Sequence, residues 1–233
     1  QNVLDTIQRL KESEAIVETT VTDFWKKGLR VQKGILTIPI KHWKKANHNF
    51  TYTWGLIKNY GFKPQQINEV HKLLAATNGA YIATPSHRFI KFNESIQIID
   101  NNAEKEHIII HVADGDLQVN EGVLHFEMKA AVKLGEIKKE AKYAYLDADK
   151  LEWPLLFRTW QATDYFYPLG LRKKKKLNHF LGSLKLSPAA KQKTAVLSMG
   201  DKLLWVVGQR IDDRFKITDQ TKNVLVITWI DKH

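Results

Sequence analysis

The segment YIATPSHRFIKFNESIQIID, residues 81–100, decides the fold class of this chain. From Ala80 onward the spacing of the apolar residues changes toward two, the period at which side chains alternate between the faces of a strand. Further short strands with Gly, Asn and Asp turns are expected after it, in HIIIHVADG, DLQVNEG and VLHFEMKA. The change of period predicts helices first and strands after them.

The residues before this segment mostly have helical spacing. Six apolar residues lie three, four or seven positions apart: Val3, Ile7, Leu10, Val17, Val21 and Phe24. They predict one amphipathic helix over about residues 2–27, ended by Gly28. Residues 30–40 are β-like, and residues 42–59 return to helical spacing. In the next helical segment, Pro64 suits a first turn and Gly79 suits the C′ position.

Turn signals organise the end of the chain. Ser187 is placed to cap a short helix that has Pro188 in its first turn, and Gly200-Asp201 predicts a hairpin. We therefore predict an α+β fold. It has a mainly helical N-terminal domain over residues 1–100 and a boundary region of short strands over residues 101–144. A compact, β-rich, barrel-like domain with one or two short helices follows over residues 145–233.

Composition excludes several classes of protein. The 233 residues include no cysteine, which excludes disulfides, cysteine-ligated metals and cysteine nucleophiles and suits a reducing cytoplasm. No apolar stretch reaches the ~20 residues needed to span a bilayer, and the polar, helical start is not typical of a signal peptide. The formal net charge is +11. Between Asp164 and Asp201 there are eight basic residues and no acidic one, which favours nucleic acid as partner, and an acidic membrane surface second.

Catalytic and metal sites are weakly supported. The twelve glycines include no pair that is adjacent or two residues apart, so no phosphate-binding loop of the G-x-G, Walker A or Ser-Gly-Gly type is possible. We expect no catalytic residue, cofactor or metal in this chain. Imidazoles and a carboxylate on neighbouring strands could bind zinc, but solvent-facing strand positions are the preferred interpretation of His107, His111, His125 and Glu127.

Two other groups of polar residues are candidates for a site. Ser86 and His87 are adjacent in an expected strand and should point to opposite faces, so they cannot form a nucleophile–base pair. A shared strand face would make a secondary anion site of Thr84, Ser86 and Arg88, with a structural turn as the alternative. For the carboxylates of GQRIDDRFK, ion pairing is preferred to acid–base catalysis, because Arg210 and Arg214 flank Asp212 and Asp213.

The segment DYFYPLGLRKKKKLNHFLGSLKLS, residues 164–187, combines an apolar stripe with a basic side. Helical spacing relates Leu177, Phe180, Leu181 and Leu184. The lysines of residues 173–176 lead into this helix, and His179, Ser183 and Lys185 lie off the stripe. Tyr165 and Tyr167 would share one face of the preceding strand, where they could stack on unpaired bases or belong to the core.

This segment belongs to two longer stretches, residues 146–187 and 203–227, that resemble the C-terminal domain of the bacterial tRNA(Ile)-lysidine synthetases. The segment YGFKPQQINEVHKLLAATNGAYIATPSHRFIKF resembles that family's central helical, substrate-binding domain. The matching residues are Pro154-Leu155, Arg158, Asp164-Tyr165-Phe166, Pro168-Leu169-Gly170, Lys175-Lys176-Leu177, Phe180, Trp205-Val206-Val207-Gly208, Arg210-Ile211-Asp212, Arg214-Phe215 and Thr221. The chain departs from the family pattern at Thr163, Ala80 and Asn178-His179.

The resemblance implies a cytoplasmic enzyme of the PP-loop ATP pyrophosphatase type. It uses ATP, with Mg, and free lysine to modify C2 of the wobble cytidine in a CAU-anticodon isoleucine tRNA. This chain lacks the catalytic Ser-Gly-Gly-x-Asp-Ser motif, so its expected partners are tRNA and an absent N-terminal catalytic domain. A homodimer is left open, and no membrane is involved.

The expected tRNA-binding residues are Arg158, Arg172, Lys173, Lys174, Lys175, Lys176, His179, Lys185, Lys191, Lys193, Arg210 and Arg214. Arg158 and Arg210 have an alternative role in pairing with Asp164 and Asp212. Two other functions are weighed against tRNA binding: a module that binds anionic surfaces or proteins, and a freestanding hydrolase.

Overall fold

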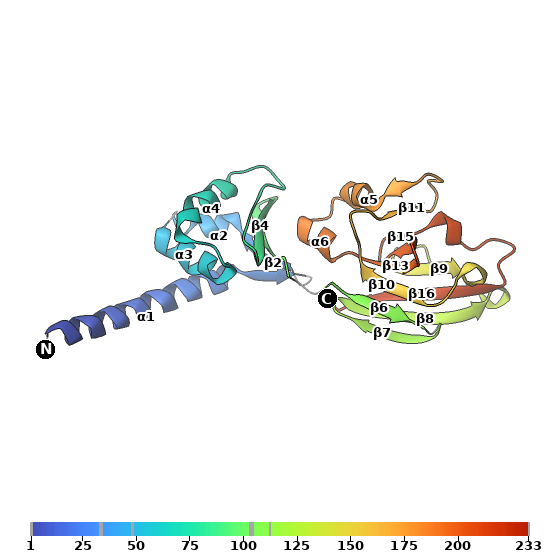
Figure 1. Cartoon of the computed structure of the whole chain (residues 1–233), viewed down its shortest axis with the longest axis horizontal. Helices are drawn as coiled ribbons and strands as arrows, with labels where there is room; N and C mark the ends of the chain where they lie inside the picture. The colour runs from blue at the N-terminus through green and yellow to red at the C-terminus, as the bar shows by residue number, and fades with distance from the viewer. Residues whose placement is uncertain (1, 33–34, 48, 103–104, 112, 233) are drawn as a thin grey trace. The chain divides into compact units, whose positions relative to one another are not determined.

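The computed structural model describes residues 2–32, 35–47, 49–102, 105–111 and 113–232 and divides into two compact units, residues 1–103 and 104–233 (Figure 1). The strands of residues 107–130, in the region expected to hold the boundary, belong to the second unit. Among the described residues, no helix has the length and apolar character to cross a membrane.

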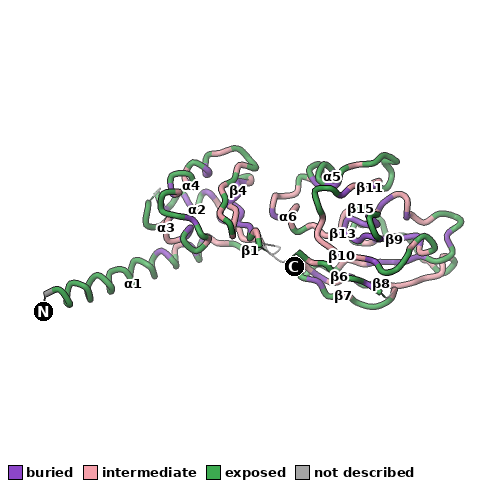
Figure 2. The backbone as a smooth tube through the Cα atoms, viewed as in Figure 1, coloured by how far each residue is buried: buried purple, intermediate pink, exposed green. Residues whose placement is uncertain are grey.

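The helices of the first unit follow the predicted order. They are α1 (Asn2–Gly28), α2 (Ile40–Lys44), α3 (Phe50–Ile57) and α4 (Ile67–Leu74). The long first helix is confirmed, and only its end packs on the unit: Val21 and Trp25 are buried, whereas the preceding described residues are exposed (Figure 2). The helix expected over residues 42–59 is split, because Asn49 caps a new helix by accepting hydrogen bonds from the Thr51 and Tyr52 amides.

Gly79 does not end α4, so its predicted C′ position is wrong. The helix ends at Leu74, and its C-cap is Ala75 in a right-handed conformation. Gly79 instead has a φ of 88° in the turn toward the sheet, where its amide donates to the Lys91 carbonyl at 2.8 Å. Its left-handed backbone serves this reversal of the chain.

One antiparallel sheet completes the first unit, with strand order β1-β2-β5-β4-β3. Its strands are β1 (Arg30–Gln32), β2 (Ile35–Pro39), β3 (Tyr81–Ala83), β4 (His87–Phe92) and β5 (Ser95–Asp100). The β-like stretch expected over residues 30–40 is a hairpin of two short strands, with Val31 opposite Leu36. Helices and sheet bury one core, in which Trp43, Ile57 and Phe89 are fully enclosed.

The second unit contains eleven described strands and two described short helices. Its strands are β6 (His107–Ile110), β7 (Gly115–Val119), β8 (Gly122–Ala130), β9 (Tyr143–Asp147), β10 (Leu155–Thr159), β11 (Tyr165–Phe166), β12 (Lys175–Lys176), β13 (Ala195–Met199), β14 (Lys202–Val206), β15 (Arg210–Ile211) and β16 (Asn223–Asp231). Its helices are α5 (Leu177–Ser183) and α6 (Pro188–Lys193). The mixed fold with a helical start is confirmed. The described strands of this unit form open sheets, and no described sheet closes on itself. The barrel-like character expected of the C-terminal domain is therefore not confirmed.

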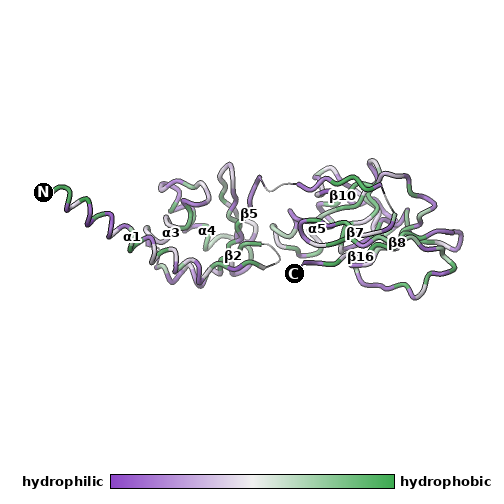
Figure 3. The backbone as a smooth tube through the Cα atoms, turned by 90° about the horizontal axis from the view of Figure 1, so that it is seen from below, coloured by the Kyte–Doolittle hydropathy of each residue, from purple (hydrophilic) through white to green (hydrophobic). Residues whose placement is uncertain are grey.

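Two larger sheets enclose the main core of this unit. One has the order β15-β14-β13-β10-β6 and the other β7-β8-β16-β9. Their facing side chains include Phe157 and Trp205 from the first and Leu124, Leu146 and Leu225 from the second, and all five are almost completely buried. Green apolar strand segments in Figure 3 follow these sheets through the unit. The core fixes β13 and β14, which carry the basic segment on their other side.

Candidate nucleic-acid interface

The basic segment is folded as a strand, a turn, a second strand and a helix. β11 and β12 pair antiparallel, with Tyr165 opposite Lys176 and Phe166 opposite Lys175. The Leu177 amide, at the start of α5, donates to the Asp164 carbonyl at 2.8 Å. Both ends of the lysine run are thereby tied to ordered backbone, so the run is not a free tail.

A small apolar cluster holds α5 on the unit, as its spacing predicted. Leu177, Phe180 and Leu181 are buried together with Phe166, and the two phenylalanine rings meet edge to face at 5.0 Å. Val196, Leu203 and Val206 of β13 and β14 form the floor of this cluster. Lys176, His179 and Lys185 are exposed. The cations are therefore mounted on a packed scaffold.

The turn between the two short strands is held by residues 211–213. Pro168 and Asp212 form an isolated β-bridge, and the Leu169 amide donates to the Ile211 carbonyl at 3.0 Å. The Asp213 amide donates to the Tyr167 carbonyl at 2.7 Å. A segment more than forty positions away in the sequence thus fixes the backbone that precedes the lysine run.

Asp212 is the buried anchor of this arrangement. Its carboxylate is fully buried and accepts hydrogen bonds from the Tyr167 amide at 3.0 Å and the Arg214 amide at 2.9 Å. The Arg214 guanidinium donates to the two carboxylate oxygens at 2.9 and 2.8 Å. The hydrogen bond to Asp212 raises the pKa of Arg214. The predicted pairing of Asp212 with Arg210 is wrong: Arg210 is exposed, and its Nη1 lies 3.5 Å from the Leu169 carbonyl.

The neighbouring carboxylate, Asp213, is partly exposed and pairs with Lys216 at 3.1 Å. Burial alone raises the pKa of Asp213, but hydrogen bonds from Lys216 and the Gly170 amide outweigh burial, so the pKa is lowered. Ion pairing, the preferred interpretation of the two aspartates, therefore describes the observed geometry. Each carboxylate has its own cation and helps to hold the turn.

Arg158 pairs with Asp164, which was the alternative to a role in binding tRNA. Its Nη1 and Nη2 donate to Asp164 Oδ2 and Oδ1, both at 2.8 Å. The side chains are 11% and 9% exposed. Asp164 also accepts from the Gln161 amide at 2.7 Å. This geometry leaves the guanidinium of Arg158 little surface for an external ligand.

Cations lie over three aromatic rings of the segment. Lys174 Nζ is 3.5 Å from the centre of the Tyr165 ring, and the Arg214 guanidinium is 4.6 Å from that of Tyr167. Lys175 Nζ lies 5.6 Å from the centre of the Phe180 ring. Such contacts stabilise a cation over the negative face of a ring. Each tyrosine that was expected to stack on bases therefore has a cation over its ring.

Helix α6 forms as its capping residues predicted. The Ser187 hydroxyl accepts from the Ala190 amide at 3.1 Å, and Pro188 is the first residue of the helix. Its lysines are engaged: Lys191 Nζ donates to Asn178 Oδ1 at 3.1 Å, and Lys193 Nζ pairs with Glu121 at 2.7 Å. These two cations are less available to a polyanion than the exposed Lys173, Lys174 and Lys176.

The secondary anion site proposed from Thr84, Ser86 and Arg88 has a different geometry from that expected. Thr84 and Ser86 lie in a turn before β4, and the Thr84 hydroxyl donates to the Tyr60 carbonyl at 2.9 Å. Arg88 Nε donates to Asn101 Oδ1 at 2.8 Å. Their polar atoms serve the structural turn that was the alternative.

The predicted orientation of the Ser86 and His87 side chains is wrong. Their side chains were expected to point to opposite faces of a strand, but Ser86 Oγ lies 2.9 Å from His87 Nδ1. The contact exists because Ser86 precedes the strand and has turn geometry.

The four candidate zinc ligands are not brought together. His125 pairs with Asp116 at 2.5 Å across β7 and β8, whereas His107 is on β6 of the other sheet. Glu127 pairs with Lys129 at 2.9 Å, and His111 is exposed. Among the residues that the structure describes, no group of three or more His, Cys, Asp or Glu side chains could hold a metal ion.

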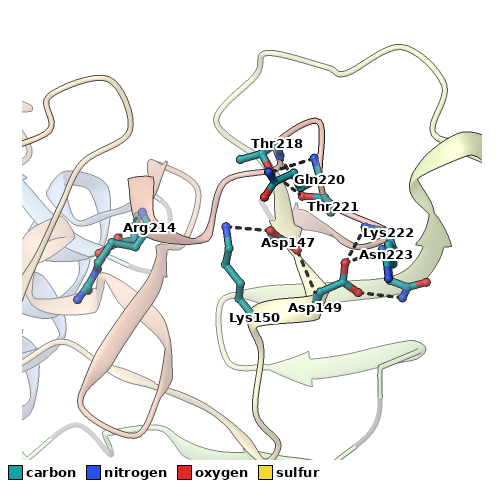
Figure 4. Close-up of polar contacts among 10 residues, drawn as sticks. Asp147, Asp149, Lys150, Arg214, Thr218, Gln220, Thr221, Lys222 and Asn223 are labelled. Atoms are coloured by element: carbon teal, nitrogen blue, oxygen red, sulfur yellow. Dashed lines mark hydrogen bonds and ion pairs between the residues drawn. The ribbon is translucent and has the colours of Figure 1, made fainter.

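Asp149 is a structural residue that the sequence analysis missed. It accepts from the Lys222 amide at 2.6 Å, and from the Asn223 amide and side chain at 3.3 and 2.9 Å (Figure 4). The hydrogen bond from the Lys222 backbone is the main cause of the lowered pKa of Asp149. The buried Thr221 accepts from the Thr218 amide at 2.9 Å in the adjoining turn. Together these bonds fix the start of β16.

Comparisons with known proteins match one family model to each of the two structural units. A family model described as the TilS substrate binding domain matches residues 31–100. A second model, the TilS substrate C-terminal domain, matches residues 155–229. Together they cover more than half of the chain and include both regions on which the resemblance was based.

Curated relatives carry the corresponding name. The tRNA(Ile)-lysidine synthase of Parabacteroides distasonis is 32% identical over 182 residues, which cover 77% of this chain and 41% of that protein. The tRNA(Ile)-lysidine synthase of Clostridium tetani is 25% identical over 185 residues, with coverages of 72% and 38%. The chain thus spans about two fifths of the length of these relatives.

A crystal structure of the TilS C-terminal domain is also similar, with a TM-score of 0.49 and 14% identity; the match covers 55% of this chain and 99% of that one. The two family models and the curated relatives confirm the resemblance seen in the sequence. The chain belongs to the TilS family and contains its substrate-binding domain and its C-terminal domain.

Proposed function

We propose that the second unit binds tRNA through the basic segment of residues 172–185 and the neighbouring Arg210. The observation that carries the proposal is that the six cations of this segment, with no acidic residue among them, are mounted on a packed strand–turn–helix scaffold. Phosphate contacts of this kind supply much of the affinity for nucleic acid and orient it without reading its sequence. The membership in the TilS family supports RNA as the polyanion.

The local contacts select the residues best placed to bind phosphate. Six cations of this surface are exposed: Arg172, Lys173, Lys174, Lys176, Lys185 and Arg210. His179 is exposed beside them and adds charge when protonated. Lys175 and Lys191 are partly exposed and contribute less. Arg158, Lys193 and Arg214 have carboxylate partners and act mainly on the fold.

For the whole protein, we propose the role that the relatives' name describes. The chain would position a CAU-anticodon isoleucine tRNA, and an N-terminal PP-loop domain would use ATP with Mg and free lysine to form lysidine at the wobble cytidine. A protein with this role is expected in the bacterial cytoplasm. The names of the relatives support this role, and lysine incorporation into that tRNA by the full-length protein tests it.

A salt titration of tRNA binding tests the role of the basic surface. If the six exposed cations neutralise six phosphates, the slope of log affinity against log salt is about −4 to −5. Replacing Lys173, Lys174, Lys175 and Lys176 by glutamine should reduce the magnitude of the slope by about 3 and weaken different tRNAs alike.

A matched control changes the same number of charges elsewhere on the unit. Lys133, Lys138, Lys139 and Lys142 are exposed outside the basic segment, and their replacement by glutamine should leave the slope nearly unchanged. Equal losses in the two variants would mean that only net charge matters. Binding of tRNA that ignores salt, or binding of anionic vesicles as tight as binding of tRNA, would contradict the proposal.

A further inference from the structure

Helix α1 carries an apolar stripe that the described residues of its own unit leave largely uncovered. Its members are three, four or seven positions apart, so they lie on one side of the helix: Val3, Ile7, Leu10, Val17 and Val21. Val21 is buried, whereas the other four are between 42% and 72% exposed. The stripe thus starts in the core of the unit and continues for ~20 Å along the exposed helix, at 1.5 Å per residue (Figure 2).

The buried end of the stripe is tightly packed. Val21 lies so close to Gly55 of α3 that a Cβ added at Gly55 would be 2.3 Å from Val21 Cγ1. Trp25 Nε1 donates to the Tyr52 carbonyl at 2.7 Å. These contacts fix the direction in which α1 leaves the unit, and with it the side to which the stripe faces.

The sequence of α1 gives this helix little stability of its own next to the packed end. Residues 16–22, IVETTVT, contain six β-branched side chains in seven positions, and such side chains lose rotamer freedom in a helix. In proteins, most of the stability of a helix comes from packing of its apolar face. The exposed part of the stripe is therefore the part of α1 that needs a partner.

A second copy of the chain is a poor partner for the stripe. Glu14 lies in the stripe between Leu10 and Val17 and is exposed. Parallel pairing of two helices would bring two Glu14 carboxylates together, and antiparallel pairing would place each carboxylate against apolar side chains. The exposed stripe spans two heptads, and so short a contact buries too little apolar area to offset the entropy that free chains lose on association.

A domain of the same polypeptide does not have this difficulty, because the covalent connection raises its effective concentration at the stripe. Helix α1 lies before the two family matches, which begin at residues 31 and 155. The two curated relatives described above are more than twice as long as the part that they share with this chain. In the proposed function, the domain that precedes α1 is the catalytic domain.

We propose that the exposed stripe docks on an apolar surface of the domain that precedes α1 in the full-length protein. The inference rests on the proposed function in one respect, that a catalytic domain precedes α1, and it adds the surface that holds this domain. The helix then packs in two domains at once and sets the position of the catalytic domain relative to the first unit. Because Glu14 lies within the stripe, the facing surface has a cation or access to water at that point.

Hydrogen exchange tests the inference by comparing this 233-residue chain with the full-length protein. In the 233-residue chain, the amides of residues 7–17 should exchange almost as fast as in an unfolded peptide, because the exposed helix frays. In the full-length protein these amides should exchange about 100-fold more slowly, as expected when two or more apolar side chains become buried. The amides of residues 22–28 should be protected alike in both proteins.

The double variant I7S/L10S of the full-length protein should lose at least about tenfold of the protection at residues 11–17. Its affinity for tRNA should equal that of the wild type, because no charge is removed. Its rate of lysine incorporation should fall, because the catalytic domain is no longer held in position. The matched control L4S/I16S changes the same residue types off the stripe, where Leu4 and Ile16 are 73% and 68% exposed. It should exchange like the wild type.

Equal exchange of residues 7–17 in the two proteins, or equal losses of protection in I7S/L10S and L4S/I16S, would overturn the inference. A dimer of the 233-residue chain that I7S/L10S abolishes would also overturn it, since the stripe would then bind a second copy. A full-length protein that shows the protection but incorporates no lysine would contradict the proposed function and support the docking of α1.

Discussion

Arg158 and Asp164 form a bidentate ion pair, with two N–H···O bonds of 2.8 Å from the guanidinium to the carboxylate. The pair joins β10 to the start of β11, and the Asp164 carbonyl also accepts the Leu177 amide of α5. One ion pair therefore links the main sheet to the scaffold of the lysine run. The Arg158–Asp164 pair therefore has a structural role: it holds the scaffold on which the lysine run is mounted.

Arg158→Met should destabilise the second unit by about 3–5 kcal/mol, because the buried Asp164 carboxylate loses its counter-charge. Urea denaturation followed by tryptophan fluorescence measures the change. The double variant R158M/D164L removes both charges and should recover much of the loss. Under conditions in which R158M is folded, its affinity for tRNA should equal that of the wild type. Weaker binding by a folded R158M would return Arg158 to the set of RNA ligands.

Asp212→Ala should both destabilise the second unit and weaken RNA binding. The variant leaves the Tyr167 amide and the buried part of Arg214 without their acceptor, and we expect a loss of about 3–5 kcal/mol. Hydrogen exchange at the Tyr167 and Leu169 amides should accelerate, because the turn loses its anchor. Asp213→Asn is the control, since this partly exposed residue should give a smaller change. Unchanged exchange at both amides in D212A would show that the turn is held by other contacts.

Gly28→Ala should destabilise the first unit. A Cβ added at Gly28 would lie 2.0 Å from the His42 ring, and this ring cannot move freely because its Nε2 is within 2.9 Å of the Phe24 carbonyl. Overpacking of this kind costs about 1–3 kcal/mol. Gly135→Ala is the control, because an added Cβ there has no neighbour within 4 Å. Differential scanning calorimetry should show a shift only in the transition of the first unit; a shift in the second alone would contradict the assignment.

Asp149 should make the stability of the second unit depend on acidity. Hydrogen bonds to its carboxylate lower its pKa from the ordinary value of 3.8, so the folded state favours the ionised form. The stabilisation is complete above the unfolded pKa and is lost as pH falls through the lower folded pKa. The melting temperature of the wild type should exceed that of D149A above about pH 5, and the difference should shrink in stronger acid.

Glu136→Ala serves as the control for this titration, because Glu136 is an exposed side chain outside the contact in Figure 4. Its melting temperature should follow that of the wild type at each pH. A difference between wild type and D149A that stays constant down to strong acid would show that the carboxylate charge is not involved.

Local signals in the sequence predicted the local elements well. The spacing of Val3, Ile7 and Leu10 predicted α1, the cap at Ser187 predicted α6, and Gly200 marks the turn between β13 and β14, with a φ of 54°. Each of these elements depends on residues a few positions apart. Their chemistry can be seen in one short stretch of sequence.

Pairings between distant residues could not be predicted in this way. Val226 of β16 lies opposite Glu127 of β8, and the register of such strands is set by which apolar faces meet in the core. The turn at Ser86 could be stated only as an alternative, because its hydroxyl donates to the Tyr60 carbonyl, which lies far away in the sequence. Both cases are decided by tertiary contacts.

In the candidate site, too, some features could be predicted from the sequence and others could not. The stripe of Leu177, Phe180 and Leu181 predicted that the lysine run is docked, because a helix must bury its apolar side. The partner of Asp212 was missed: Arg210 and Arg214 are both two positions away, and the turn after Asp212 selects Arg214. The exposure of Leu169 and Leu171 was also out of reach, since apolar residues between aromatics are typical of a core.

The short strand β12 has a consequence for how electrostatic valence is counted. Neighbouring residues of a strand point to opposite faces, as Lys175 and Lys176 of β12 do. Lys174, which precedes the strand, lies over the Tyr165 ring, whereas Lys175 lies over the Phe180 ring. A single phosphate chain passing on one side therefore meets fewer ammonium groups than the four consecutive letters suggest. In a folded protein, the number of lysines in such a run that one polyanion can contact depends on the face to which each side chain points. A basic stretch on a strand divides its charge between the two faces of that strand.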